Sequence, residues 1–91
     1  MESHDQLFIA GAMVPAHGTQ DLPVVDCFTE EAFASFRSAG AQDVEAAVAA
    51  ARRAFEGWSL TPGAERAKAL RRIAAALRDQ EKALSAALSR E

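Results

Sequence analysis

Two amphipathic helical patterns fill the second half of the chain and limit its possible folds more than any other feature. In both, apolar residues recur every three or four positions, so each set falls on one face of a helix. The two sets are Val44, Val48, Ala51 and Phe55, and then Ala67, Leu70, Ile73, Ala74 and Leu77. Helices with such stripes pack against something, whereas nothing on them is arranged to react. The pattern therefore predicts a packing role for these helices and not a reactive one.

Residues that typically begin and end helices predict the bounds of the first one. Gly40 is a suitable N-cap, and Asp43 in the first turn complements the positive end of the helix dipole. Gly57 suits the left-handed position that follows a helix end. The first helix is therefore predicted from about residue 41 to 56. We expect Trp58, just beyond it, to be a buried anchor of the loop between helices rather than a binding platform.

The second helix is predicted to begin with Thr61 as N-cap and Pro62 in the first helical position. The helix is predicted to run to about residue 78. Its apolar stripe is interrupted by Glu81 and resumes at Leu84 and Leu88. This slip predicts a break near residues 79–80 and a third helical stretch to about residue 89.

The first forty residues read as short strands. An apolar run over residues 7–14 ends at Pro15, and Gly11 within it predicts a tight bend or a bulge. Extended segments are also predicted over residues 22–28 and 32–36. The fold prediction is a β-hairpin or short strands followed by two to three amphipathic α-helices.

Composition limits the size and the class of protein that this chain can form. Ninety-one residues, 49% of them hydrophobic and 25% charged, allow one small globular domain or a segment of a larger one. Cys27 is the single cysteine, which excludes an internal disulfide and fits a reducing compartment. No apolar run approaches the roughly 20 residues of a membrane span, and the acidic, polar N-terminus is unlike a secretory signal. We expect a cytoplasmic protein with no membrane partner.

Charge is divided unevenly along the chain. Residues 1–40 have a net charge of −5 and residues 41–91 a net charge of +2. The basic residues of the second half could form a nucleic-acid face. They alternate with the apolar stripe, however, and acids lie among them, so we interpret them as a solvated helix face and expect no nucleic-acid partner.

Few residues could carry chemistry. The five glycines form neither a dinucleotide fingerprint nor a phosphate loop, and no histidines have metal-ligand spacing. Cys27 has no base beside it, so a small buried strand residue is favoured over a nucleophile. We expect His17 to be exposed and idle, and His4 to lie in a frayed terminus. The residues themselves predict no catalytic, cofactor-binding or metal site.

The order of these motifs resembles the N-terminal segment of the NAD(P)-dependent aldehyde dehydrogenases. Residues 8–14 (FIAGAMV) are similar to the family's Phe-Ile-x-Gly-x-Trp-Val strand, with Met13 where an aromatic residue is usual. The stronger match runs over residues 43–55 and Trp58, and continues through residues 65–77 to Glu91. The family turn Asn-Pro-x-Thr-Gly-Glu is matched here at Thr29 and Glu31, whereas Cys27 and Glu30 replace its Pro and Gly.

The resemblance implies an α/β parent enzyme that oxidises aldehydes to carboxylic acids with NAD or NADP and forms a homo-oligomer. Residues 1–91 would be the N-terminal part of its cofactor-binding domain, with strands and turns over 1–40 and helices over 41–91. The catalytic and oligomerisation domains would be absent. The chain would be scaffold, inactive alone and without a cofactor of its own, and its partner would be the remainder of the dehydrogenase fold.

The resemblance also supplies one metal candidate, a monovalent-cation site at Val24, Val25 and Glu91, which we expect to be vacant in this chain. Two other hypotheses stand beside the dehydrogenase segment. The first is a stand-alone α+β protein-interaction module, and the second, ranked last, is a nucleic-acid binder that uses the arginines of the second helix.

Overall fold

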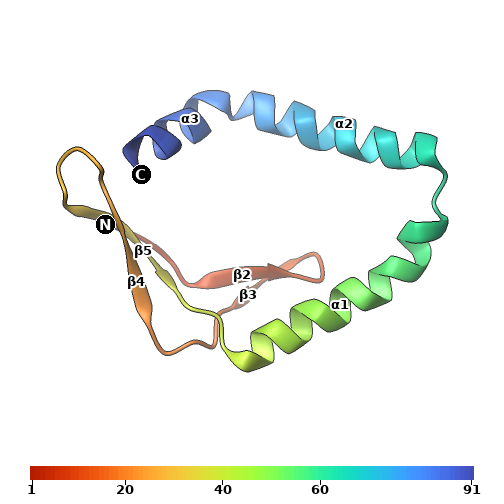
Figure 1. Ribbon diagram of the computed structural model, residues 1–91, viewed down its shortest axis with the longest axis horizontal. Coiled ribbons are helices and arrows are strands. Elements are labelled where there is room, and N and C mark those ends of the chain that lie inside the picture. The colour runs from red at the N-terminus through yellow and green to blue at the C-terminus, as the bar shows by residue number, and fades with distance from the viewer.

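The computed structural model describes all 91 residues, as five short strands followed by three helices. The strands are β1 (Glu2–His4), β2 (Gln6–Ile9), β3 (Ala12–Pro15), β4 (Asp21–Val25) and β5 (Ala32–Arg37). The helices are α1 (Ala41–Leu60), α2 (Gly63–Asp79) and α3 (Glu81–Arg90). This confirms the prediction of short strands and two to three helices. Figure 1 shows that the helices form an open hoop, which begins at the strands and returns to them at the end of α3.

Strands β2 and β3 form an antiparallel hairpin in which Leu7 pairs with Val14 and Ile9 with Ala12. The two turn residues, Ala10 and Gly11, have φ values of 54° and 80°. Two-residue hairpin turns with positive φ at both central positions match the right-handed twist of the strands. The bend predicted at Gly11 is confirmed, and the apolar run over residues 7–14 is two strands rather than one.

A three-stranded sheet places β5 between β1 and β4. β4 is antiparallel to β5, whereas β1 is parallel to it and pairs His4 with Phe36. The predicted strand over residues 32–36 is therefore confirmed. The prediction that His4 lies in a frayed terminus is wrong, because its backbone is paired within the sheet. Asp26–Glu31 form the turn that joins β4 to β5.

The junction between the first two helices differs from the prediction. α1 continues through Gly57 to Leu60, and Thr61 follows in extended conformation, with its hydroxyl donating a 2.8 Å hydrogen bond to the Gly57 carbonyl. Thr61 thus caps the end of α1 instead of starting α2, whose N-cap is Pro62. Gly57 takes no left-handed turn, because the helix continues through it to Leu60. The predicted break at residues 79–80 is confirmed, with Gln80 between α2 and α3.

The chain is far more open than a compact domain. Its radius of gyration is 16.7 Å, against about 12 Å expected for a compact chain of this length. Ala34, at 5% exposed, is the one buried apolar residue, and no side chain is fully buried. Trp58 lies within α1 and is 48% exposed, so the prediction that it is a buried anchor is wrong in this chain. No helix is both long enough and apolar enough to cross a membrane.

The stripes that predicted the helices are uncovered. The following apolar side chains are more than half exposed: Val44, Val48, Phe55, Leu70, Ile73 and Leu77. The accessible surface is 7406 Å², whereas a compact protein of 9.7 kDa exposes about 5,100 Å². The difference is about 2,300 Å², which is the size of a large interface.

Candidate functional site

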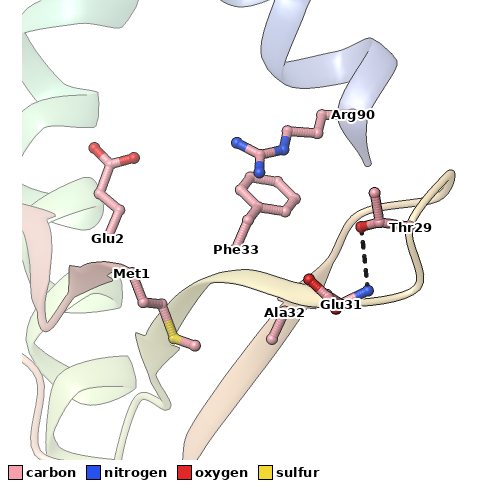
Figure 2. Close-up of a pocket in the computed structure, with 7 residues that line it drawn as sticks. All are labelled: Met1, Glu2, Thr29, Glu31, Ala32, Phe33 and Arg90. Carbon is pink, nitrogen blue, oxygen red and sulfur yellow. Dashed lines mark hydrogen bonds between the residues drawn. The ribbon is translucent and has the colours of Figure 1, made fainter.

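A surface hollow of about 500 Å³ lies where the end of α3 returns to the sheet. Figure 2 shows the side chains around it, which come from the N-terminal residue, β1, the turn after β4, β5 and the last turn of α3. They are Met1, Glu2, Thr29, Glu31, Ala32, Phe33 and Arg90. The guanidinium of Arg90 stands over the ring of Phe33, with its central carbon 4.2 Å from the ring centroid.

The carboxylate of Asp26, the residue directly after β4, binds both the turn and the end of α3. Its Oδ1 accepts hydrogen bonds from the backbone N–H groups of Phe28 (2.8 Å) and Thr29 (3.1 Å), which fixes the turn. Its Oδ2 accepts a 2.8 Å hydrogen bond from Nε of Arg90. The Arg90 guanidinium, followed by the two N–H groups, lowers the pKa of Asp26 to about 2. Asp26 is therefore ionised at neutral pH and paired across the hoop.

Cys27 lies beside Asp26 in the turn and is exposed, so the prediction of a buried strand residue is wrong. β4 ends at Val25, two residues before the cysteine. The Cys27 N–H donates to the Arg90 carbonyl at 2.8 Å, and its thiol donates to the Ser89 carbonyl at 3.3 Å. These contacts make Cys27 a partner for the end of α3 rather than a nucleophile, because no base accepts its proton.

A second polar cluster joins the turn before β4 to the start of α1. Asp43 Oδ2 accepts hydrogen bonds from the backbone N–H groups of His17 (2.7 Å) and Gly40 (2.8 Å). Its Oδ1 lies 2.6 Å from Nδ1 of the same histidine. The Gly40 N–H, followed by His17, lowers the pKa of Asp43 to about 2. The prediction that His17 is idle is wrong, although its side chain is half exposed.

The start of α1 offers no open N–H groups to a dinucleotide phosphate. Phosphates bind where free N–H groups and a helix N-terminus face the ligand. The loop between β5 and α1 has that general layout, but the Asp43 carboxylate already occupies the Gly40 N–H and would repel an anion. No phosphate cradle is thus open at the start of α1.

The candidate cation residues lie at the same corner as the hollow. Val24 and Val25 end β4, directly before Asp26, and Glu91 follows Arg90. The Asp26–Arg90 bond therefore brings the two ends of this set near one another. No group of three or more His, Cys, Asp or Glu side chains could hold a metal ion. The expectation that the monovalent-cation site is vacant stays a prediction.

Comparison with known proteins decides the family. Residues 13–91 match the profile described as the aldehyde dehydrogenase family. This chain belongs to the aldehyde dehydrogenase family. It is 43% identical over 84 residues to betaine aldehyde dehydrogenase 1 of Oryza sativa subsp. japonica. The aligned residues cover 87% of this chain and 17% of the rice protein. It is 44% identical over 84 residues to aminoaldehyde dehydrogenase 2 of Zea mays, with the same coverage.

A bacterial relative gives similar values. The chain is 42% identical over 89 residues to N-succinylglutamate 5-semialdehyde dehydrogenase of Burkholderia vietnamiensis, which covers 94% of the chain and 18% of that protein. This aldehyde dehydrogenase chain thus spans less than a fifth of the length of the curated relatives it matches. The resemblance found in the motifs is confirmed.

Sequence reasoning missed both polar clusters. One local signal was present for each, namely an aspartate at the start of a turn and an aspartate in the first turn of a helix, which both bind nearby N–H groups. Nothing in the local pattern pointed to their distant partners, Arg90 and His17.

Proposed function

We propose that this chain is the N-terminal part of the cofactor-binding domain of a dehydrogenase that oxidises aldehydes to carboxylic acids with NAD⁺ or NADP⁺. Within that enzyme its role is scaffolding. The observation that carries the proposal is the uncovered apolar surface of α1 and α2 in a chain whose residues 13–91 match the family.

The excess surface supports a large partner. About 2,300 Å² beyond that of a compact protein exceeds the roughly 800 Å² that each partner contributes to a standard protein interface. Obligate interfaces of this size resemble a domain core cut in half. We infer that the remainder of the dehydrogenase fold covers the stripes of α1 and α2, and that the complete enzyme is a homo-oligomer.

The chemistry of such an enzyme lies outside these residues. The resemblance implies a cysteine that attacks the aldehyde, hydride transfer to the nicotinamide and hydrolysis of the resulting thioester. Cys27 matches no position of that machinery, and its thiol points to the Ser89 carbonyl. We therefore propose that the 91 residues alone neither oxidise aldehydes nor bind NAD⁺ or NADP⁺ tightly.

Calorimetric titration of the chain with NAD⁺ and NADP⁺ tests its proposed lack of a cofactor site. We expect no heat of binding at micromolar concentrations of either cofactor. Micromolar binding would contradict the proposal, because the Asp43 carboxylate occupies the start of α1.

Covering of the stripes is tested by mixing the chain with the remaining portion of a related dehydrogenase, produced without its first segment. We expect a stable one-to-one complex by size-exclusion chromatography with light scattering. Phe55→Glu, at a stripe position 68% exposed in the chain, should abolish it. Arg72→Glu makes a matched change off the stripe and should leave the complex intact.

The enzyme segment and the stand-alone module predict different behaviour for the isolated chain. Several side chains, each worth roughly 1.5–3 kcal/mol when buried, are left uncovered. For a segment of a larger enzyme we expect a helical chain that melts with low cooperativity and binds hydrophobic dye or self-associates. A monomer with a two-state melt and no dye binding would instead favour the module.

A further inference from the structure

The helical arm α2–α3 is joined to the strands at one corner. Every hydrogen bond between residues 61–91 and residues 1–40 runs between the pair Asp26–Cys27 and the pair Ser89–Arg90. The single ion pair between these two parts of the chain is Arg90 with Asp26. Figure 1 shows α2 crossing the far side of the hoop before α3 returns to the turn between β4 and β5.

The contacts at this corner complete the end of α3. The last carbonyls of a helix have no partner within the helix. Here the Ser89 and Arg90 carbonyls accept hydrogen bonds from the thiol and the N–H of Cys27, 62 and 63 residues earlier. The last carbonyls of α3 are therefore satisfied by the turn between β4 and β5.

Arg90 adds two contacts of a different kind. Its guanidinium donates a hydrogen bond to the Asp26 carboxylate and stacks on the ring of Phe33. The Arg90 side chain is therefore held by both a negative charge and an aromatic face. Asp26 is 8% exposed, and its other oxygen is already held by the turn, so the carboxylate is fixed before Arg90 arrives. A fixed acceptor loses little freedom when it binds a mobile arginine.

We propose that Asp26, Cys27, Phe33, Ser89 and Arg90 form a clasp, a conformational device that opens and closes the hoop. In the closed state α2 and α3 are held against the sheet corner. In the open state Arg90 leaves Asp26, and the end of α3 separates from the turn between β4 and β5. The turn itself survives opening, because the bonds from Phe28 and Thr29 to Asp26 are local.

The clasp has a consequence that rests on the proposed function. A closed hoop fixes the arm relative to α1, so the stripes of both helices are presented together. Binding that needs no further ordering is tighter, because less conformational freedom is lost on association. Opening the clasp should then weaken docking of the remaining fold without altering the docking surface.

Amide hydrogen exchange by NMR on the 91-residue chain tests the clasp directly. The Cys27 N–H reports the closed state, whereas the Phe28 and Thr29 N–H groups report the turn. Arg90→Gln removes the guanidinium, and Asp26→Asn retains the oxygen that holds the turn. We expect each variant to lower the protection factor of the Cys27 N–H about tenfold, corresponding to about 1.4 kcal/mol. The Phe28 and Thr29 protection factors should change less than about twofold, since their acceptor is kept.

Two comparisons make this test specific. Arg78→Gln removes the same charge from α2, outside the clasp, and should leave Cys27 protection unchanged. The double variant of Asp26→Asn with Arg90→Gln should lose no more protection than either single variant, because both break one interaction. Circular dichroism should give equal helicity for all variants, which separates opening from unfolding.

The proposal is overturned if Cys27 protection is unchanged in both single variants, or if Phe28 and Thr29 lose protection equally with Cys27. These readouts need neither a cofactor nor the remaining fold, so they stand apart from the proposed dehydrogenase role. If the clasp holds but docking does not occur, the proposed function fails and the clasp stands.

Discussion

The carboxylate of Asp43 binds both the backbone N–H and the imidazole of His17, a residue 26 positions earlier in the chain. The same carboxylate holds the N–H of Gly40, so one side chain ties the turn before β4 to the first turn of α1. The Gly18 N–H adds a 2.9 Å hydrogen bond to the Ser38 carbonyl. Together these contacts set the direction in which α1 leaves the sheet.

Acid should loosen this junction. The pKa of Asp43 is lowered from 3.8 to about 2. Because the folded pKa lies below the unfolded one, the carboxylate contributes stability that is full above pH 3.8 and is lost as the pH falls through about 2. We expect the Asp43 carboxyl carbon to titrate near pH 2 by NMR, and His17 N–H protection to fall over the same range.

Asp26 titrates in the same window, so a variant is needed to separate the two. Asp43→Asn should lower the exchange protection of the His17 N–H at neutral pH and remove most of the pH dependence of that protection. The pH dependence of Phe28 N–H protection, which comes from Asp26, should remain. A midpoint near 3.8 for Asp43 would contradict the geometry described.

A methyl group at Gly18 should disrupt the junction. A Cβ at this position would overlap the backbone carbonyl of Ser38, which cannot move without breaking its bond to the Gly18 N–H. We expect Gly18→Ala to destabilise the junction by about 1–3 kcal/mol, measured from amide exchange at Gly18 and His17.

Gly57→Ala is the matched control. Gly57 lies inside α1, and a Cβ there meets no atom within 4 Å. Alanine is about 1 kcal/mol more favourable than glycine within a helix, so helicity by circular dichroism should rise. Equal destabilisation by both substitutions would mean that the close approach to Ser38 is not formed.

Trp58 is a built-in reporter of docking. It is the only tryptophan and is 48% exposed in the last turn of α1. We expect long-wavelength fluorescence from the chain and a shift to shorter wavelength when the remaining dehydrogenase fold is added. Trp58→Ala should have little effect on the helicity of the chain alone, but should destabilise the assembled enzyme by about 3–5 kcal/mol. An unchanged unfolding midpoint in the assembled enzyme would show that the ring stays exposed there.

Potassium should not stabilise the chain. Val24, Val25 and Glu91 offer two backbone carbonyls and one carboxylate, which is a sparse set for a hard cation. We expect equal thermal denaturation curves in potassium chloride and in a salt of a bulky cation at the same ionic strength. Stabilisation by potassium alone would instead indicate a bound ion at this corner.

The sequence predicted the elements whose pattern is local. The apolar stripes predict α1 and α2. The interruption of the stripe at Glu81 predicts the break at Gln80, and Gly11 predicts the hairpin bend. Each depends on residues within a few positions of one another, where periodicity and backbone preference act.

The errors arise where distant groups meet. The Asp26–Arg90 bond joins residues 64 positions apart, and periodicity carries no information about such a pair. The position of Trp58 between a predicted helix end and Thr61-Pro62 predicts a buried anchor, but no part of this chain covers the side chain, which is 48% exposed. At Gly57 the local stop signal does not end the helix, which continues to Leu60 and is capped by Thr61.

The capping of α3 by Cys27 also orders events during synthesis of the chain. The turn that holds Asp26 and Cys27 emerges from the ribosome early, whereas its partners Ser89 and Arg90 are added more than sixty residues later. The hairpin and α1 depend on nearer contacts and can form first. We therefore expect the nascent chain to be a sheet with a growing, unattached arm until the last turn of α3 has left the ribosome.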